Sequence, residues 1–159
     1  MTGRDGTRPA AARGRVLDCC ISERKGTRKH HCDAIELRVG LGIVGDAHAG
    51  AWHRQVSLLG NESVDSMRGK GVDLAAGDFA ENVLTEGLSL CELSVGSVLQ
   101  AGECLLAVTQ IGKACHNDCE IRRLVGTCVM PTEGIFCVVL RGGTLRPGDE
   151  IRALDLDTL

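Results

Sequence analysis

Aromatic residues are scarce in this chain of 159 residues, which contains one tryptophan, two phenylalanines and no tyrosine. Proteins that bind single-stranded nucleic acid stack the bases on aromatic side chains along a positively charged groove. The small number of aromatic residues and a formal net charge of −3 both argue against such a partner. We therefore expect no interaction with nucleic acid.

Long apolar runs are also missing. A membrane-spanning helix requires about 18 to 20 consecutive apolar residues, and no window of this sequence contains such a run. The first 13 residues, MTGRDGTRPAAAR, lack the apolar stretch of a secretory signal. We expect a cytoplasmic protein without a membrane segment, with a disordered tail over residues 1–13 and one domain over residues 14–159.

The cysteines do not fit a disulfide framework. Such frameworks are typical of short secreted domains with an even cysteine count, whereas this chain has nine cysteines and enough length to bury a core. We expect free thiols in a reducing compartment. Packing explains those that lie singly in or beside apolar runs, such as Cys91, Cys104 and Cys137.

Short apolar segments separated by glycine or by Pro-Gly-Asp make up most of the chain. They predict strands at residues 15–22, 34–39 and 55–59, and further strands within ENVLTEG, GSVLQAG, ECLLAVTQIG, GIFCVVLRGG and DEIRAL. The basic stretch 23–31 and the glycine-rich stretch 40–50 are expected to be loops. This pattern is typical of a mostly β domain, either a barrel or a sandwich.

Two helices fit between the predicted strands. Asn61 is expected to cap a helix over residues 62–68, which ends at the glycines of GKG. A second helix is expected over residues 117–125, which ends at Gly126. The fold prediction is one mostly β domain with two or three short helices.

The stretch QIGKACHNDCE, residues 110–120, contains the first candidate site. Cys115 falls where a predicted strand gives way to a predicted helix, and the free N–H groups of a helix start stabilise a thiolate. The neighbouring Lys113 and His116 favour the thiolate as well. This position predicts a nucleophilic Cys115, with an ordinary buried cysteine as the alternative.

A metal site is a further alternative for the same stretch. Cys115, His116, Cys119 and Cys128 supply four soft ligands within 14 residues. Their C-x3-C and C-x8-C spacings differ from the C-x2-C pairs of structural zinc sites. We expect no metal here, and a redox pair or buried helix cysteines remain open alternatives.

Two glycine-containing loops carry the remaining candidate residues. The first loop concentrates basic side chains, and the second combines charged groups with a close approach to the backbone, which together favour an anion ligand. We expect the two loops to converge at one mouth of the barrel, with Cys115 at the floor of the pocket. The alternative is that these are solvated loop charges. The residues are Lys25, Arg28, Lys29, His30 and His31 in the first loop, and Asp46, His48 and Arg54 in or beside the second.

Seven ordered blocks of the sequence closely resemble the MOSC domain, named for the C-terminal part of molybdenum cofactor sulfurases. The resemblance runs from about residue 14 to residue 154, nearly the whole chain. The blocks are GIVGDAHAG, RQVSLL, Glu62, GDFAENVLTEGLSL, VGSVLQAGECLLAVTQIGKAC, EGIFCVVLRGG and PGDEI.

The resemblance implies a β-barrel that binds the molybdenum cofactor (molybdopterin) or a related pterin and handles sulfur through one cysteine. The family cysteine falls on Cys115, and we count Asn82 and Lys113 among the candidate cofactor contacts with the loop residues. In the sulfurases a separate pyridoxal-phosphate domain generates the persulfide sulfur, and related two-domain proteins reduce N-hydroxylated substrates. We expect no partner domain beside this one, which is similar to stand-alone bacterial MOSC units.

The resemblance implies a cysteine desulfurase or a molybdoenzyme as partner. Cys119 and Cys128 depart from the common MOSC pattern and are similar to a smaller group within it, so Cys115 acts alone, in a transient disulfide or with a metal. Three function classes stay open. They are a sulfur carrier that binds the cofactor, a metal-binding or redox-sensing module, and a non-catalytic interaction subunit of molybdopterin biosynthesis.

Overall fold

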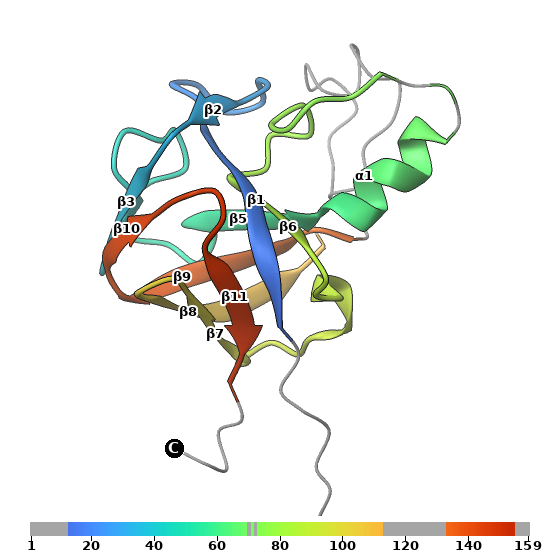
Figure 1. The fold of residues 1–159 in the computed structure, drawn as a ribbon. Helices are drawn as coiled ribbons and strands as arrows, with labels where there is room; N and C mark the ends of the chain where they lie inside the picture. Colours follow the sequence, from blue (N-terminus) through green and yellow to red (C-terminus); the bar gives the residue numbers. More distant parts are fainter. Residues whose placement is uncertain (1–12, 70, 72, 113–132, 155–159) are drawn as a thin grey trace, which may run out of the picture.

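The computed structural model describes residues 13–69, 71, 73–112 and 133–154 (Figure 1). These residues form strands, one α-helix and one short 3-10 helix. The elements are β1 (Arg13–Ile21), β2 (His30–Cys32), β3 (Ile35–Arg38), β4 (Gly42–Ile43), β5 (Val56–Gly60), α1 (Asn61–Arg68), β6 (Val83–Glu86), η1 (Leu90–Glu92), β7 (Val98–Ala101), β8 (Cys104–Ile111), β9 (Ile135–Arg141), β10 (Gly143–Leu145) and β11 (Glu150–Ala153).

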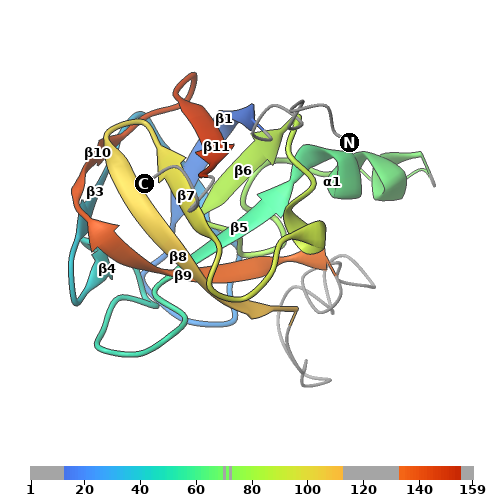
Figure 2. The same ribbon diagram turned by 90° about the horizontal axis from the view of Figure 1, so that it is seen from below.

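Seven strands form a closed barrel in the order β11-β7-β8-β9-β5-β6-β1, and pairing of β1 with β11 closes it. Figure 2 shows these strands around a common interior. Neighbours in the barrel are antiparallel except β5 and β6. Parallel neighbours need a crossover connection, and α1 supplies it here. The mostly β barrel with few helices that the sequence predicts is therefore confirmed.

The strands form where the sequence alternates. In β8, Cys104, Leu106 and Val108 are buried and the residues between them are partly exposed. The side chains of β5 are all buried, because this strand has the barrel interior on one face and the packing of α1 on the other. Alternation thus identifies a half-buried strand, and a continuous apolar run identifies one covered on both faces.

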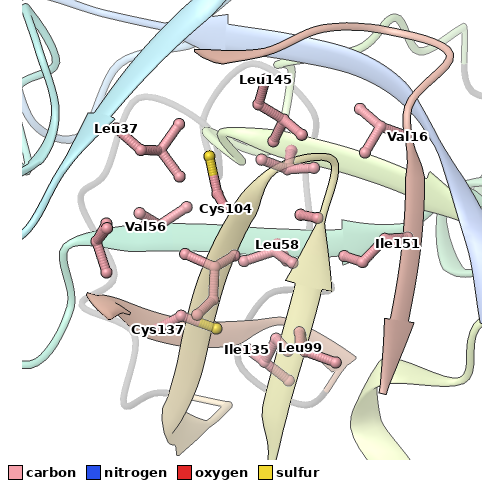
Figure 3. Packing of buried hydrophobic residues seen from close by; sticks show 14 of the residues in the cluster. Val16, Leu37, Val56, Leu58, Leu99, Cys104, Ile135, Cys137, Leu145 and Ile151 are labelled. Atoms are coloured by element: carbon pink, nitrogen blue, oxygen red, sulfur yellow. The ribbon is translucent and has the colours of Figure 1, made fainter. Parts of the chain in front are cut away.

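Of the two hydrophobic clusters among the described residues, the larger fills the barrel interior (Figure 3). Leu58, Leu99 and Ile151 are fully buried there, and Cys104 and Cys137 pack beside them as small apolar side chains. A second cluster contains Val64 and Met67 of α1 together with residues of the adjoining strands and loops. The packing interpretation is confirmed for Cys104 and Cys137 and wrong for Cys91, which is exposed.

Three local predictions were wrong. The glycine-rich stretch 40–50 is not a loop throughout, because β4 pairs there with β3. Gly60 occupies the N-cap of α1 without any side-chain cap, and Asn61 is the first helical residue, because β5 continues directly into the helix. The side chain of Asn61 bonds along the helix instead, to Asp65 and Arg68. The predicted basic loop also contains β2, which forms by pairing with the end of β1.

Two further predictions concern the N-terminal tail and the second helix. β1 begins at Arg13, the last residue of the predicted tail, while residues 1–12 and the predicted helix at residues 117–125 lie outside the described residues. In the described part, no helix is long and apolar enough to cross a membrane.

Candidate functional site

The candidate site is a group of aromatic and cationic side chains around Trp52, here called the Trp52 patch. It consists of Lys25, His48, Trp52, His53 and Arg54. The Lys25 ammonium lies 4.5 Å and the Arg54 guanidinium carbon 4.8 Å from the centroid of the Trp52 ring. The His48 ring is parallel to the indole at a centroid distance of 6.2 Å, and the His53 ring meets it edge-on at 5.9 Å.

Two loops distant in sequence build the Trp52 patch. The loop between β1 and β2 carries Lys25, and the loop between β4 and β5 carries the other four residues. The loops lie side by side at one end of the barrel (Figure 1), where the Ala47 amide donates to the Ser22 carbonyl over 2.8 Å. The Trp52 indole N–H donates to the His48 carbonyl over 2.7 Å, which ties the aromatic ring to its own loop.

Arg54 is the most unusual member of the patch. Its guanidinium lies against two aromatic rings, 4.8 Å from the Trp52 centroid and 5.6 Å from the Phe136 centroid. Its Nε is buried and has no hydrogen-bond partner among the described residues. A buried polar group without a partner destabilises the fold, and a cationic one does so more strongly. An anion at this position would supply the missing acceptor.

The positive charge of the patch has no acidic partner within the described residues. Within the described residues, no carboxylate forms an ion pair with Lys25 or Arg54. Cation–π contacts hold these side chains in place without neutralising them. The patch therefore presents two fixed positive charges that suit an anionic group.

A buried network lies behind the patch. The Lys29 ammonium contacts Asp46 Oδ1 at 2.8 Å, His48 Nδ1 at 3.1 Å and Ser22 Oγ at 3.1 Å. The side chains of Lys29 and Asp46 have no exposed surface. Asp46 also accepts from the backbone amides of Ser22 and His48, each at 3.1 Å. The network joins the two loops that carry the patch.

Both charges of this ion pair are perturbed by burial. Burial lowers the pKa of Lys29, and the charge of Asp46 opposes that change. Burial by itself raises the pKa of Asp46, but the contacts with His48 and Lys29 outweigh it and hold this pKa below its usual range. Asp46 is therefore ionised at neutral pH and holds Lys29 as its counter-ion.

A sequence model of the MOSC domain matches residues 45–152, which is more than half of the chain. The chain belongs to the MOSC domain family. The matched residues include four members of the Trp52 patch, whereas Lys25 and Lys29 precede them. A comparison of this MOSC domain with curated proteins finds no match.

Solved structures share the fold of this MOSC domain. The YuaD protein from Bacillus subtilis superposes with a TM-score of 0.72 at 20% identity, over 90% of this chain and 97% of YuaD. YiiM from Geobacillus stearothermophilus gives a TM-score of 0.68 at 18% identity, over 89% of this chain and 75% of YiiM. YiiM from Escherichia coli gives 0.65 at 19% identity, over 90% and 70%. At these identities the likeness concerns the fold.

The structure brings together only some of the residues singled out from the sequence. Lys25, His48 and Arg54 meet at the Trp52 patch, and Asp46 lies behind it with its carboxylate bonded within the protein. Arg28 lies 3.9 Å from Asp78 and lines a separate open hollow of about 410 Å³. Lys25 of the basic loop therefore belongs to the Trp52 patch, whereas Arg28 of the same loop lies at the separate hollow.

Asn82 is fully buried and bonds only within the fold. Its Oδ1 accepts from the Ser57 amide at 2.9 Å, and its Nδ2 donates to the Cys20 carbonyl at 3.0 Å. These bonds link β5 to β1, so the Asn82 side chain is used within the fold and does not belong to the Trp52 patch.

The predicted thiol site belongs to the stretch 113–132. Cys115, Lys113, His116, Cys119 and Cys128 all lie outside the described residues. Among the residues that are described, no group of three or more His, Cys, Asp or Glu side chains could hold a metal ion.

Sequence reasoning missed Trp52, and it did not separate Lys29 from its exposed neighbours. The position of the only tryptophan beside a glycine-rich loop was a usable signal for the first. No local signal indicates that Lys29 is buried, because the basic run contains several similar cations. Only the contact with Asp46, 17 residues later, distinguishes Lys29 from them.

Glu81 is a further buried acid that the sequence analysis did not single out. It accepts from the amides of Gly77 at 2.7 Å and Phe79 at 3.1 Å. Burial raises the pKa of Glu81 to about 7 despite these bonds. The turn it holds supports the basic loop, because the Lys29 amide donates to the Gly77 carbonyl over 2.8 Å.

Proposed function

We propose that this MOSC domain binds the molybdenum cofactor or a related phosphate-bearing pterin and carries sulfur on Cys115. The Trp52 patch would hold the phosphate. The observation that carries this proposal is the pair of cations, Lys25 and Arg54, that lie against Trp52 without a carboxylate partner in the described part of the chain. The association of MOSC domains with molybdenum-cofactor-related function supports the same ligand.

The residues of the patch fit a phosphate. A guanidinium donates to phosphate oxygens in a planar, bidentate geometry, and an ammonium adds a point charge. Arg54 would gain acceptors for a buried group that has none among the described residues. Lys25 reaches the same ring from the neighbouring loop. When bound, the cofactor supplies a metal that accepts a terminal sulfur ligand.

The sulfur step belongs to Cys115. Its thiolate attacks the outer sulfur of a donor persulfide, the bond between the two donor sulfurs breaks, and the donor leaves as a thiolate. The outer sulfur and its proton then remain on Cys115 as a new persulfide. A pyridoxal-phosphate-dependent cysteine desulfurase carries such a persulfide and is the donor we propose. A molybdoenzyme is the proposed acceptor, and we place both partners in the cytoplasm.

The anion part of the proposal is testable by fluorescence, because Trp52 is the only tryptophan of the chain. We expect titration with inorganic phosphate, and then with a pterin phosphate, to change the emission with saturation. Arg54→Gln should weaken binding about tenfold or more, the effect of losing a charge-assisted hydrogen bond. Arg15→Gln is the matched control, since Arg15 pairs with Glu86 near the start of β1. Equal affinities in the two variants would contradict the assignment.

The sulfur part has an independent readout. After incubation with a cysteine desulfurase and free cysteine, the peptide that contains Cys115 should gain the mass of one sulfur atom. Cys115→Ser should abolish this gain. A sulfur gain that persists in Cys115→Ser, on another cysteine, would refute the role of Cys115 and leave the anion site unaffected.

A further inference from the structure

Lys29 has no capacity left to bind a ligand. An ammonium has three hydrogens and no acceptor, and Lys29 has three partners within hydrogen-bond distance, on Ser22, Asp46 and His48. Its side chain has no exposed surface. A role for Lys29 at the Trp52 patch must therefore act through one of these partners, and His48 is the partner that belongs to the patch.

The contact with Lys29 determines which nitrogen of the His48 ring carries the proton. Because the ammonium only donates, His48 Nδ1 must accept at 3.1 Å and cannot carry a proton itself. Asp46 Oδ2 lies 3.7 Å from Nδ1, farther away than the Lys29 ammonium, so Lys29 is the nearer partner of this nitrogen, and the closer contact of Asp46 with His48 is through the backbone amide at 3.1 Å. A neutral imidazole that accepts at Nδ1 carries its proton on Nε2.

We infer that Lys29 is a positioning residue that holds His48 with its proton on Nε2, so that the imidazole presents an N–H donor to an anion at the Trp52 patch. The second half of this inference rests on the proposed function, whereas the tautomer itself does not. His48 would thus add a neutral donor to the two cations of the patch.

The placement of the ring supports this role. The Nδ1 edge faces the fully buried Lys29, so Nε2 points away from it. The His48 side chain is 19% exposed and its ring lies parallel to Trp52. Asp46 and Ser22 hold the Lys29 ammonium in place, which orients the donor before any ligand arrives.

The tautomer can be measured without a ligand. In protein labelled with ¹⁵N-histidine, the two ring nitrogens of neutral His48 give different shifts according to which one is protonated, and His48→Gln assigns the signals. At a pH of about 8, where imidazoles are neutral, we expect the Nε2–H form alone. The Nδ1–H form, or a mixture of the two, would overturn the inference.

A variant that lacks the Lys29 ammonium tests whether Lys29 sets the tautomer of His48. Lys29→Met combined with Asp46→Asn removes both buried charges and so avoids an unpaired ion. In this variant we expect both tautomers of His48, and an unchanged Nε2–H form would show that Lys29 does not set it. If the double variant fails to fold, the wild-type spectrum alone decides.

Inorganic phosphate, followed by Trp52 fluorescence, tests the link to binding. A glutamine amide places an N–H near the position of Nε2, and an asparagine amide places one near Nδ1. His48→Gln should therefore bind phosphate within about threefold of wild type, and His48→Asn about tenfold more weakly. Equal affinities of the two variants would refute the donor role. Failure of the wild-type protein to bind phosphate would refute the proposed function and leave the tautomer result standing.

Discussion

Lys29→Met should destabilise the fold although Lys29 lies outside every core cluster. Methionine keeps the length of the side chain but removes the ammonium that lies 2.8 Å from Asp46, in a place where neither side chain is exposed. Removing one partner of a buried ion pair costs about 3–5 kcal/mol, because the other charge stays buried. The amides of Ser22 and His48 still stabilise the carboxylate, so we expect the lower end, about 3 kcal/mol.

Urea denaturation at pH 7, followed by Trp52 fluorescence and by circular dichroism, measures this change. In a separate thermal denaturation, a loss of about 3 kcal/mol should lower the melting temperature by roughly 6–12 °C for a domain of this size. Asp46→Asn alone should also destabilise, since it leaves the ammonium of Lys29 without its counter-ion. The double variant should lose less than the sum of the two, by about 2–3 kcal/mol. Additive effects would refute the argument that the two residues act as a pair.

The pH dependence supplies a second check. The pKa of Asp46 is held below its unfolded value by His48 and Lys29, against the effect of burial, so the ionised carboxylate stabilises the native state above a pH of about 4. This contribution is lost as the pH falls through the native pKa. The wild type and Lys29→Met should therefore differ less in acid than at pH 7. A constant difference would contradict the assignment.

Three further predictions follow from single residues. The pKa of Glu81 is raised from 4.5 to about 7 by burial, so stability should fall by about 3 kcal/mol as the pH rises through this range, and Glu81→Gln should flatten the profile in urea titrations. Gly77→Ala should lower the free energy of unfolding by about 2 kcal/mol or more, because Gly77 has φ +87° and the new Cβ would lie 2.1 Å from the Lys29 carbonyl oxygen. Gly71→Ala is the control: Gly71 has φ +89°, but its new Cβ meets no atom within 4 Å, so the loss in urea denaturation should be smaller. Cys115 should alkylate faster near a pH of about 6.5 than the exposed Cys91 and than Cys104, whose pKa burial raises to about 11. Equal rates for Cys115 and Cys91 in peptide mapping would refute the nucleophile assignment.

The barrel was predictable because its strands carry their burial pattern in the sequence. The buried residues Cys104, Leu106 and Val108 stand at every second position of β8, and β3 alternates Ile35 and Leu37 with charged neighbours in the same way. These patterns fix which face of a strand turns inward. They do not state the strand order, which depends on pairings such as that of β1 with β11.

Short elements that depend on a partner were not predictable. His30 and His31 are polar and exposed, and they join β2 because the end of β1 offers them a pairing edge. The start of α1 depends in the same way on β5, which runs into the helix without the side-chain cap expected from Asn61. In both places a tertiary contact decides the local structure, and no local propensity reports it.

The candidate site was partly predictable for a similar reason. Charged residues beside glycines indicate a loop that can approach a ligand, and Lys25, His48 and Arg54 do meet at the Trp52 patch. Asn82 has the same polar character but faces the interior. Orientation is a property of the folded backbone, so residue type alone did not separate a side chain that faces a ligand from one that bonds within the fold.

Lys25 and Lys29 belong to one loop, yet they have opposite consequences for the charge of the site. The only acid of the glycine-rich loop, Asp46, is buried and bonded to Lys29. Because this pair neutralises itself inside the protein, no carboxylate of that loop remains to compensate the cations at the Trp52 ring. The buried pair thus joins the two loops and leaves the positive charge of Lys25 and Arg54 uncompensated by that loop. In the proposed anion site, the basic loop that precedes the family match thus supplies both Lys25 and the buried partner of Asp46.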